Sequence, residues 1–432
     1  MFRYCIYQKT LLYLVESNIF PKKELYFNSE ISLNKPVNKP IKLESKPDII
    51  LITLDSLRND YAQKLLSIND GGFLNFSKNS YNFTNAYSHS SYTVSSISSL
   101  FTGKYLTSRF DTKDKSLVKI LDNNSYVTYS LNVNSAPLLF EEFIINDKKY
   151  KSIFSEGFDV LDRTKSEKYN HSEFRSLFSS FINKRDKTKP FFAWVHFSNL
   201  HMIHPFVFFE NFFSGDNFKK KYKSLLIESD ENLEMFINII KQNNLYDNSI
   251  IILTSDHGEG MKDHGSLFHV FGLYEEYVRV PLFIKFPKQK TFKIIEDKVS
   301  LIDVFPTILE YTDSENQYTD YDGLSLINLI ENTKLKKKYT FLSFCLFKPI
   351  KRFENFSLYG SGYNNKKIII ETAIIDNTNS YKLIKNHIFG YEELYNLNDD
   401  PREQNNLIDD ESKIAKYLRK ELFKKISRAM VD

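Results

Sequence analysis

The chain has 432 residues, 42% of them hydrophobic and 15% aromatic, which is enough to bury a large core. Its 58 basic and 54 acidic side chains leave a net charge of +4, too small and too dispersed to indicate a nucleic-acid partner. The two cysteines, Cys5 and Cys345, lie far apart and match neither a disulfide framework nor a metal motif. We therefore expect a globular protein with one large domain and a smaller second part.

Residues 1–47 are predicted to form an irregular N-terminal arm. They carry scattered charges and the proline-containing run NKPVNKPIKLESKP. No segment of the chain reaches the roughly 18 consecutive apolar residues of a membrane span, and LLYLV is too short for the core of a signal peptide. The sequence thus predicts a cytoplasmic protein without a membrane span.

From Asp48 onward, apolar runs alternate with segments of helical period. The predicted strands are 48–55, 125–133, 190–198, 249–260 and 280–287. Between the third and fourth strands, one amphipathic helix carries Leu233, Phe236, Ile237 and Ile240 on a single face. Strands and helices that alternate in this way predict an α/β fold with a mostly parallel central sheet flanked by helices.

The C-terminal part is predicted to form a small α+β subdomain, residues 336–432, after a catalytic domain that spans residues 48–335. Its expected elements are strands in 339–347 and 365–376, an edge strand and turn in 393–407, and a closing helix in 410–430. The closing helix places Ile414, Tyr417, Leu418 and Leu422 on one face.

Acidic residues and histidines stand at the ends of the predicted strands. Asp55 closes the first strand, His201 follows the third, and Asp256 and His257 follow the apolar run of the fourth. In a parallel sheet the carboxyl ends of the strands meet at one edge, where ligands bind. Carboxylates and neutral imidazole suit a divalent metal ion, so Asp55, Asp256 and His257 are the predicted ligands.

Each of these residues also has a structural interpretation. An aspartate after a strand can serve as a helix N-cap, and Asp-His-Gly can form a turn. His196 lies inside the third strand pattern, and we interpret it as a core residue or as a residue behind the ligands. His264, in KDHG, is a weaker candidate in a loop.

The segment YTVSSISSLFTG, residues 92–103, gathers six hydroxyl side chains in a predicted helix. Val94, Ile97, Leu100 and Phe101 form an apolar face, and Gly103 suits the helix end. Thr93 would stand at the N-terminus, where free backbone N–H groups attract an anion. From the segment alone, the N-cap interpretation of Thr93 is the favoured one.

Eight segments in order resemble the sulfatase-like hydrolases of the alkaline phosphatase superfamily. Two of them, PDIILITLDSLRND and LYDNSIIILTSDHGEGMKDHG, are similar to the family's two metal-binding turns, and FTNAYSHSSYTVSSISSLFTGKY is similar to its nucleophile segment. The others are PFFAWVHFSNLHMIHPF, LYEEYVRVPLFIKFP, SLIDVFPTILEY, DGLSL and ELYNLNDDPREQNNL. The resemblance covers most of the chain after Asp48.

The family register implies that Thr93 is the nucleophile. Alignment on SLFTG places Thr93 where sulfatases of the family carry a cysteine or serine that is oxidised to formylglycine. Threonine offers no comparable aldehyde route. The resemblance therefore points to the superfamily's threonine branch, in which the alkoxide attacks directly and forms phosphothreonine. Thr93 would also contact the metal ion.

The resemblance further implies that His201 and His269 contact the substrate or the leaving group. Two positions depart from the family pattern. Ile97 stands where the family has an arginine, so Arg58, Lys104 or another basic residue would have to supply that positive charge. Ser56 stands where the family has an acidic metal ligand. With a histidine ligand and few carboxylates, the expected cofactor is one divalent ion, with manganese or zinc favoured and calcium possible.

The leading functional hypothesis is a metal-dependent hydrolase of phosphate mono- or diesters that uses Thr93. The alternatives are a phosphotransferase that acts on a glycan or lipid head group, a sulfuric ester hydrolase, and a non-catalytic binding protein that keeps the fold. The expected substrate is an ester of a small molecule, a glycan or a lipid head group. The substrate itself carries no readable motif.

Overall fold

The computed structural model describes residues 46–67, 71–105, 116–132, 143–145, 148–150, 157–164, 171–201, 215–269, 272–314, 318–331, 337–347 and 367–431. The arm predicted for residues 1–47 lies almost wholly outside these ranges. Among the described helices, none combines the length and the apolar character that crossing a lipid bilayer requires.

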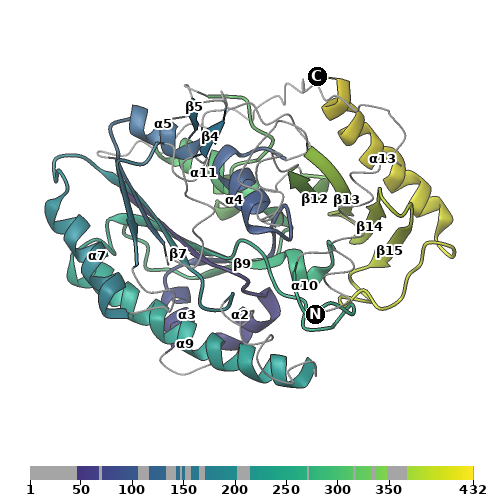
Figure 1. The fold of residues 1–432 in the computed structure, drawn as a ribbon, viewed down its shortest axis with the longest axis horizontal. Coiled ribbons are helices and arrows are strands. Elements are labelled where there is room, and N and C mark those ends of the chain that lie inside the picture. Colours follow the sequence, from purple (N-terminus) through teal and green to yellow (C-terminus); the bar gives the residue numbers. More distant parts are fainter. Residues whose placement is uncertain are drawn as a thin grey trace.

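A nine-stranded sheet forms the centre of the molecule (Figure 1). Along the sheet the strands are β10 (Lys293–Ile295), β2 (Tyr81–Tyr87), β9 (Arg279–Lys285), β8 (Ser249–Thr254), β1 (Asp48–Leu54), β7 (Phe191–Phe197), β3 (Val127–Asn132) and β6 (Val160–Arg163), and β11 (Val299–Ser300) also pairs with β2. Strands β8 to β6 are parallel, and β9 runs antiparallel to both of its neighbours. The predicted mostly parallel sheet is confirmed, and a strand lies in each of the five predicted ranges. The fourth strand ends at Thr254, so residues 255–260 form a turn and not the end of a strand.

Helices cover both faces of this sheet (Figure 1). On one face lie α2 (Asn59–Leu65), α3 (Gly72–Ser77), α7 (His171–Lys184) and α9 (Gly215–Gln242), and on the other lie α4 (Thr93–Thr102), α5 (Leu117–Asn123) and α11 (Val304–Tyr311). The predicted amphipathic helix is the second half of α9, and its four apolar residues are buried. Burial of that stripe against the sheet explains why the helix forms there.

The C-terminal part is a four-stranded antiparallel sheet covered by one long helix. Its strands, in spatial order, are β12 (Tyr339–Phe347), β13 (Lys367–Asp376), β14 (Tyr381–Asn386) and β15 (Glu392–Asn396), and the helix is α13 (Ser412–Val431). Leu418 and Leu422 of α13 pack on this sheet, whereas Tyr417 is 41% exposed and lies at the rim of the predicted face. Figure 1 shows α13 on the outer side of this sheet.

Short elements complete the described structure. They are β4 (Phe143–Ile145), β5 (Lys148–Tyr150), α10 (Glu275–Val278), the 3-10 helix η1 (Leu301–Asp303) and α12 (Ile327–Ile330). Among them, α10 matters most for the site, because it contacts both the turn after β8 and the C-terminal sheet.

Candidate active site

Side-chain alternation along three neighbouring strands brings the polar residues together. In β1, β7 and β8, every second residue faces the layer that contains α4; these residues are Ile49 and Leu51, Phe192 and Trp194, and Ile250 and Ile252. Successive side chains of a strand point to opposite faces of the sheet. Asp55, His196 and Asp256 continue the same alternation at the carboxyl ends of the three strands. They therefore lie on the face of the sheet that α4 covers.

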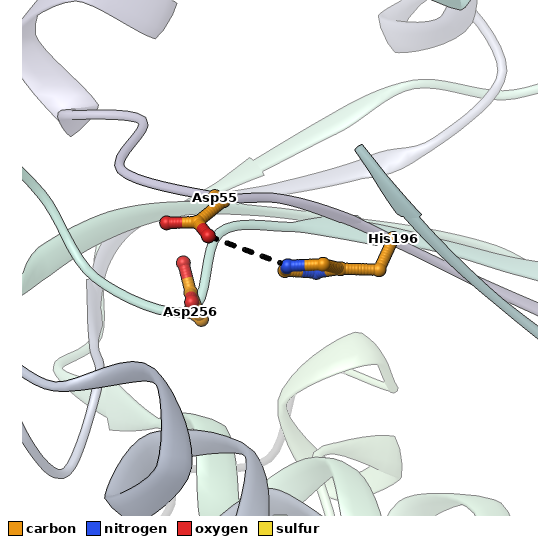
Figure 2. Close-up of side chains that lie close together, drawn as sticks. All are labelled: Asp55, His196 and Asp256. Carbon is orange, nitrogen blue, oxygen red and sulfur yellow. Dashed lines mark ion pairs between the residues drawn. The ribbon is translucent and has the colours of Figure 1, made fainter. Parts of the chain in front are cut away.

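Asp55, His196 and Asp256 form a buried group that could hold a metal ion (Figure 2). One ligand atom from each residue lies within 4.8 Å of the others. The Nε2 atom of His196 lies 3.4 Å from Asp55 Oδ2. His196 Nε2 and Asp256 Oδ2 are both buried without a hydrogen-bond partner. A divalent cation between these two atoms would give each of them a partner. The nitrogen and oxygen donors of this group therefore suit a divalent cation.

The carboxylates are electrostatically unequal. Burial opposes ionisation of Asp55, but the imidazoles of His201, His196 and His257 hold its pKa well below the usual range. Burial and then the charge of Asp55 raise the pKa of Asp256. Two buried carboxylates at close range cannot both ionise easily unless a cation lies between them. The charge distribution therefore agrees with a cation site.

His257 presents one ring nitrogen to this group. Its Nδ1 lies 2.9 Å from the carbonyl oxygen of Gly258, so Nδ1 carries a proton and donates it. The Nε2 atom lies 3.6 Å from Asp55 Oδ1 and 3.5 Å from Asp256 Oδ2. Burial lowers the pKa of His257, and the two carboxylates outweigh that effect and raise it. The predicted ligands Asp55, Asp256 and His257 thus lie side by side.

Thr93 lies at the same point. Its Oγ1 is 2.9 Å from Nε2 of His257. The N-cap of α4 is Tyr92, which makes no side-chain capping hydrogen bond, so Thr93 is the first helical residue and not the cap. Gly103 ends the helix with a φ of 67°, a left-handed conformation that glycine adopts without strain. The threonine hydroxyl therefore faces the acidic group and leaves the helix backbone free.

Ser56 orients both carboxylates. Its hydroxyl donates a hydrogen bond to Asp55 Oδ1 at 2.9 Å, and its backbone N–H donates to Asp256 Oδ1 at 3.2 Å. The residue has a φ of 64°, which is uncommon for a residue other than glycine. Tyr222 donates to the Ser56 carbonyl oxygen at 2.7 Å and helps to hold this turn. Ser56 thus supplies hydrogen bonds where the family pattern has a further carboxylate.

Of the two predicted substrate histidines, His269 lies against His257, and His201 lies beyond His269. The ring of His269 stacks on that of His257 with 4.0 Å between centroids, and His201 lies 5.6 Å from His269. His269 Nδ1 is 3.3 Å from Glu259 Oε2. The structure therefore brings His269 against His257, and His201 close enough to Asp55 to lower the pKa of its carboxyl group.

The basic residues considered as substitutes for the family arginine are engaged elsewhere. Arg58 pairs with Asp60 at 2.9 Å and with Asp263 at 2.7 Å, and these carboxylates raise its pKa despite its burial. Lys104 pairs with Asp320 and follows the C-terminal end of α4, about 15 Å along the helix from Thr93. Ile97 itself is buried in the core.

The sequence interpretation placed His196 behind the ligands, whereas the structure places it within the group that could hold the ion. The alternation Phe192, Trp194, His196 was the available signal, since it puts His196 on the same face as Asp55. Thr53, the preceding member of the β1 row, was not considered. Its Oγ1 accepts a hydrogen bond from Trp194 Nε1 at 3.0 Å and lies 2.7 Å from His196 Nδ1.

The fold has counterparts among solved structures. The phosphonate monoester hydrolase of Agrobacterium radiobacter superposes with a TM-score of 0.68 at 16% sequence identity, over 89% of this chain and 96% of that one. At this identity the likeness concerns the fold alone.

The sequence comparisons are more specific. The family model described as Sulfatase matches residues 47–314, and that of the N-sulphoglucosamine sulphohydrolase C-terminal region matches residues 263–430. The chain belongs to the sulfatase family.

Curated relatives match over shorter segments. An N-acetylglucosamine-6-O-sulfatase of Bacteroides thetaiotaomicron is 28% identical over 198 residues, which cover 44% of this chain and 32% of that protein. Arylsulfatase K of Canis lupus familiaris is 34% identical over 94 residues, or 22% and 17% of the two proteins. The chain thus matches less than half the length of either relative.

Proposed function

We propose that this protein is a metal-dependent hydrolase of phosphate mono- or diesters in which Thr93 is the covalent nucleophile. The observation that carries the proposal is the 2.9 Å contact between Thr93 Oγ1 and His257 Nε2, beside the carboxylates of Asp55 and Asp256. A hydroxyl that served only to cap the helix would instead bond to the backbone of its own first turn.

The chemistry of threonine separates this site from a formylglycine sulfatase. Cysteine and serine have a CH₂ group at Cβ, which can be oxidised to an aldehyde. Threonine has a methyl group there, so oxidation would end at a ketone. An unmodified hydroxyl can instead attack a phosphoryl centre directly.

In the first step, Thr93 loses its hydroxyl proton to solvent, and the Oγ1 alkoxide attacks phosphorus while the bond from phosphorus to the leaving oxygen breaks. His201 or His269 donates a proton to that oxygen, which leaves as the alcohol. Backbone N–H groups at the N-terminus of α4 favour the negative charge of the phosphoryl group. The product is phosphothreonine at position 93.

In the second step, water attacks phosphorus and the bond to Thr93 Oγ1 breaks. The histidine that gave its proton accepts one from the water, and the Thr93 alkoxide takes a proton back from solvent. Phosphate, or a phosphomonoester from a diester substrate, is released. An alcohol in place of water would make the protein a transferase, so hydrolysis and transfer differ only in the acceptor.

Asp55, Asp256 and His257, joined by His196, would hold one divalent ion, for which manganese or zinc suits the mixed donor set. Such an ion lowers the pKa of a nearby hydroxyl and neutralises charge on the phosphoryl oxygens. The chain's own contribution is to keep the donors in place. Ser56 orients the two carboxylates, and the Gly258 carbonyl fixes the His257 tautomer.

Sulfuric ester hydrolysis is the second candidate. It is favoured by the match of residues 47–314 to the sulfatase family and by the sulfatase names of the curated relatives. Against it stands Thr93 at the nucleophile position.

The test is hydrolysis of aryl phosphate, phosphodiester, phosphonate and sulfate esters by chelator-stripped protein to which manganese, zinc, magnesium or calcium is returned. We expect metal-dependent turnover of a phosphorus ester that disappears in Thr93→Ala. Turnover of the sulfate ester alone would favour the second candidate. Activity unchanged by Thr93→Ala would exclude Thr93 as the nucleophile, and silence on every ester would favour a transferase or a binding protein.

A further inference from the structure

A buried ion-pair group joins the C-terminal sheet to the catalytic domain. Lys382 of β14 is fully buried, and its Nζ lies 3.1 Å from Glu275 Oε1 and 2.9 Å from Glu403 Oε1. Glu403 belongs to the loop after β15, and its other carboxylate oxygen accepts the backbone N–H of Glu275 at 2.6 Å. The buried Glu403 carboxylate thus has two donors, Lys382 Nζ and the Glu275 N–H, and it holds both in place.

Glu275 begins α10, and α10 supports the turn that carries the predicted metal ligands. The backbone N–H of Gly258 donates to the Tyr277 carbonyl oxygen at 2.7 Å, and that of Glu259 donates to the Glu276 carbonyl oxygen at 3.0 Å. A Cβ atom at Gly258 would lie only 2.0 Å from the Glu276 oxygen. The two segments are therefore in close backbone contact, and a shift of α10 would move the turn.

Glu403 holds a second segment near the site through His264. His264 Nε2 lies 2.8 Å from the Glu403 carbonyl oxygen, and His264 Nδ1 lies 2.7 Å from Glu276 Oε1. A carbonyl oxygen and an ionised carboxylate only accept, so both ring nitrogens donate and His264 is an imidazolium. The loop that contains His264 leads to His269, which stacks on His257.

We propose that Glu403 is a positioning residue for the Asp256–Glu259 turn. It lies far from the acidic group in sequence and acts from behind the turn: its side chain accepts the Glu275 N–H, and its backbone carbonyl contacts His264. A residue of the C-terminal part thereby sets the geometry of ligands supplied by the catalytic domain. The turn's part in catalysis rests on the proposed function, whereas its tie to Glu403 does not depend on it.

The experiment is amide hydrogen exchange on the full chain, with no substrate required. We compare the wild type with Glu403→Ala, Glu403→Gln and the control Glu392→Ala. Glu392 also belongs to the C-terminal part, at the start of β15, but pairs with Lys385 and Arg419. The amides that decide the outcome are those of Gly258 and Glu259, and the amides of β1 report global opening.

Loss of the buried acceptor in Glu403→Ala should speed exchange at Gly258 and Glu259 by about tenfold or more, with β1 little changed. Glu403→Gln keeps the side-chain volume but leaves one of its two donors without an acceptor, so its effect should be smaller and in the same direction. Glu392→Ala should match the wild type at Gly258 and Glu259.

Two results would overturn the proposal: wild-type exchange at Gly258 and Glu259 in Glu403→Ala, or an equal acceleration in β1, which would mean a global loss of stability. If Glu403→Ala does not fold, Glu403→Gln decides by the same two criteria. Because exchange needs no turnover, a protein that hydrolyses none of the esters could still confirm the role of Glu403.

Discussion

Thr93 and His257 are 164 positions apart in the sequence, yet Thr93 Oγ1 and His257 Nε2 lie 2.9 Å apart in the fold. The contact joins the first residue of α4 to the turn after β8. It also brings the hydroxyl beside the buried carboxylates of Asp55 and Asp256, which both lie within 3.6 Å of His257 Nε2.

The first prediction concerns the hydroxyl itself. Thr93→Ala removes the nucleophile and should reduce phosphoester turnover by about 10³-fold or more. Thr93→Ser keeps a hydroxyl and should retain measurable turnover. Rapid quench followed by mass spectrometry should find a phosphorylated residue 93 in the wild type and in Thr93→Ser. A phosphorylated peptide elsewhere in the chain would contradict this assignment.

The second prediction concerns metal removal. Asp256→Asn removes one of two adjacent buried carboxylates and should weaken manganese or zinc binding by about tenfold or more, measured by titration calorimetry. Chelation should also lower the melting temperature of the wild type, because an ion that binds only the folded state stabilises it. In Asp256→Asn the chelator effect should be much smaller. Equal metal affinity in both proteins would place the ion elsewhere.

The third prediction concerns the close backbone contact at Gly258. Gly258→Ala would put a Cβ atom 2.0 Å from the Glu276 carbonyl oxygen, so the turn or α10 must move. We expect weaker metal binding and a free energy of unfolding lower by about 1–3 kcal/mol. Gly265→Ala is the matched control. Its φ is 81° but no atom lies within 4 Å of the added Cβ, so it should lose stability without loss of metal affinity.

The fourth prediction concerns Thr53. Thr53→Val removes the hydroxyl between Trp194 Nε1 and His196 Nδ1 and leaves both buried nitrogens without that partner. The expected loss of stability is about 1–3 kcal/mol by denaturant unfolding. Because His196 would no longer be held, metal affinity should fall too.

Thr254→Val is the control for this substitution. Thr254 pairs in register with Thr53 and donates to the Pro281 carbonyl oxygen at 2.7 Å. It should lose stability but keep its metal affinity. If both variants bound metal like the wild type, Thr53 would have no role in positioning His196.

The fifth prediction concerns pH. Burial lowers the pKa of His264, but the Glu276 carboxylate and the Glu403 carbonyl outweigh that effect and raise it from 6.5 to about 9. The folded state therefore holds this proton more tightly than the unfolded state. The resulting stability is fully present below about pH 6.5 and is lost as the pH rises through about 9.

His264→Gln should accordingly cost about 2 kcal/mol more near pH 6 than near pH 10, measured by urea unfolding. His387→Gln is a control of opposite sign, since burial lowers the pKa of His387 to about 4 and keeps it neutral in the folded state, whereas the unfolded state binds a proton near pH 6. Its cost should therefore be about 1 kcal/mol smaller near pH 6 than near pH 10. A cost of His264→Gln that is the same at both pH values would mean that His264 is not held as an imidazolium.

Local pattern was sufficient for much of the fold. Apolar runs such as IILITL and SIIILT are buried on both faces of the sheet, so their composition identifies them as central strands without tertiary information. Asp55 and Asp256 each follow such a run closely. Because parallel strands end at one edge of the sheet, the sequence also predicted that these two residues lie at that edge. The start of α4 and its end at Gly103 followed from helical period and glycine chemistry.

The strand β14 shows where local pattern fails. Its sequence YKLIKN places a lysine at a fully buried position, which the pattern of a half-exposed strand would assign to solvent. Lys382 is buried because Glu275 and Glu403 approach it from distant parts of the chain. That pairing is a tertiary event and leaves no periodic signal in the sequence.

The sequence by itself determined the class of fold. It also predicted the sheet edge of the site and the residues Asp55, Thr93, Asp256 and His257, which the structure brings close together. It could do so because strand ends, helix starts and family motifs are local features. Only the tertiary structure decided that His196 joins the group, that Arg58 and Lys104 are held by other carboxylates, and that Glu403 accepts the backbone N–H of Glu275. Each of these depends on which distant side chain lies within 3–4 Å, and that distance is set by packing between elements.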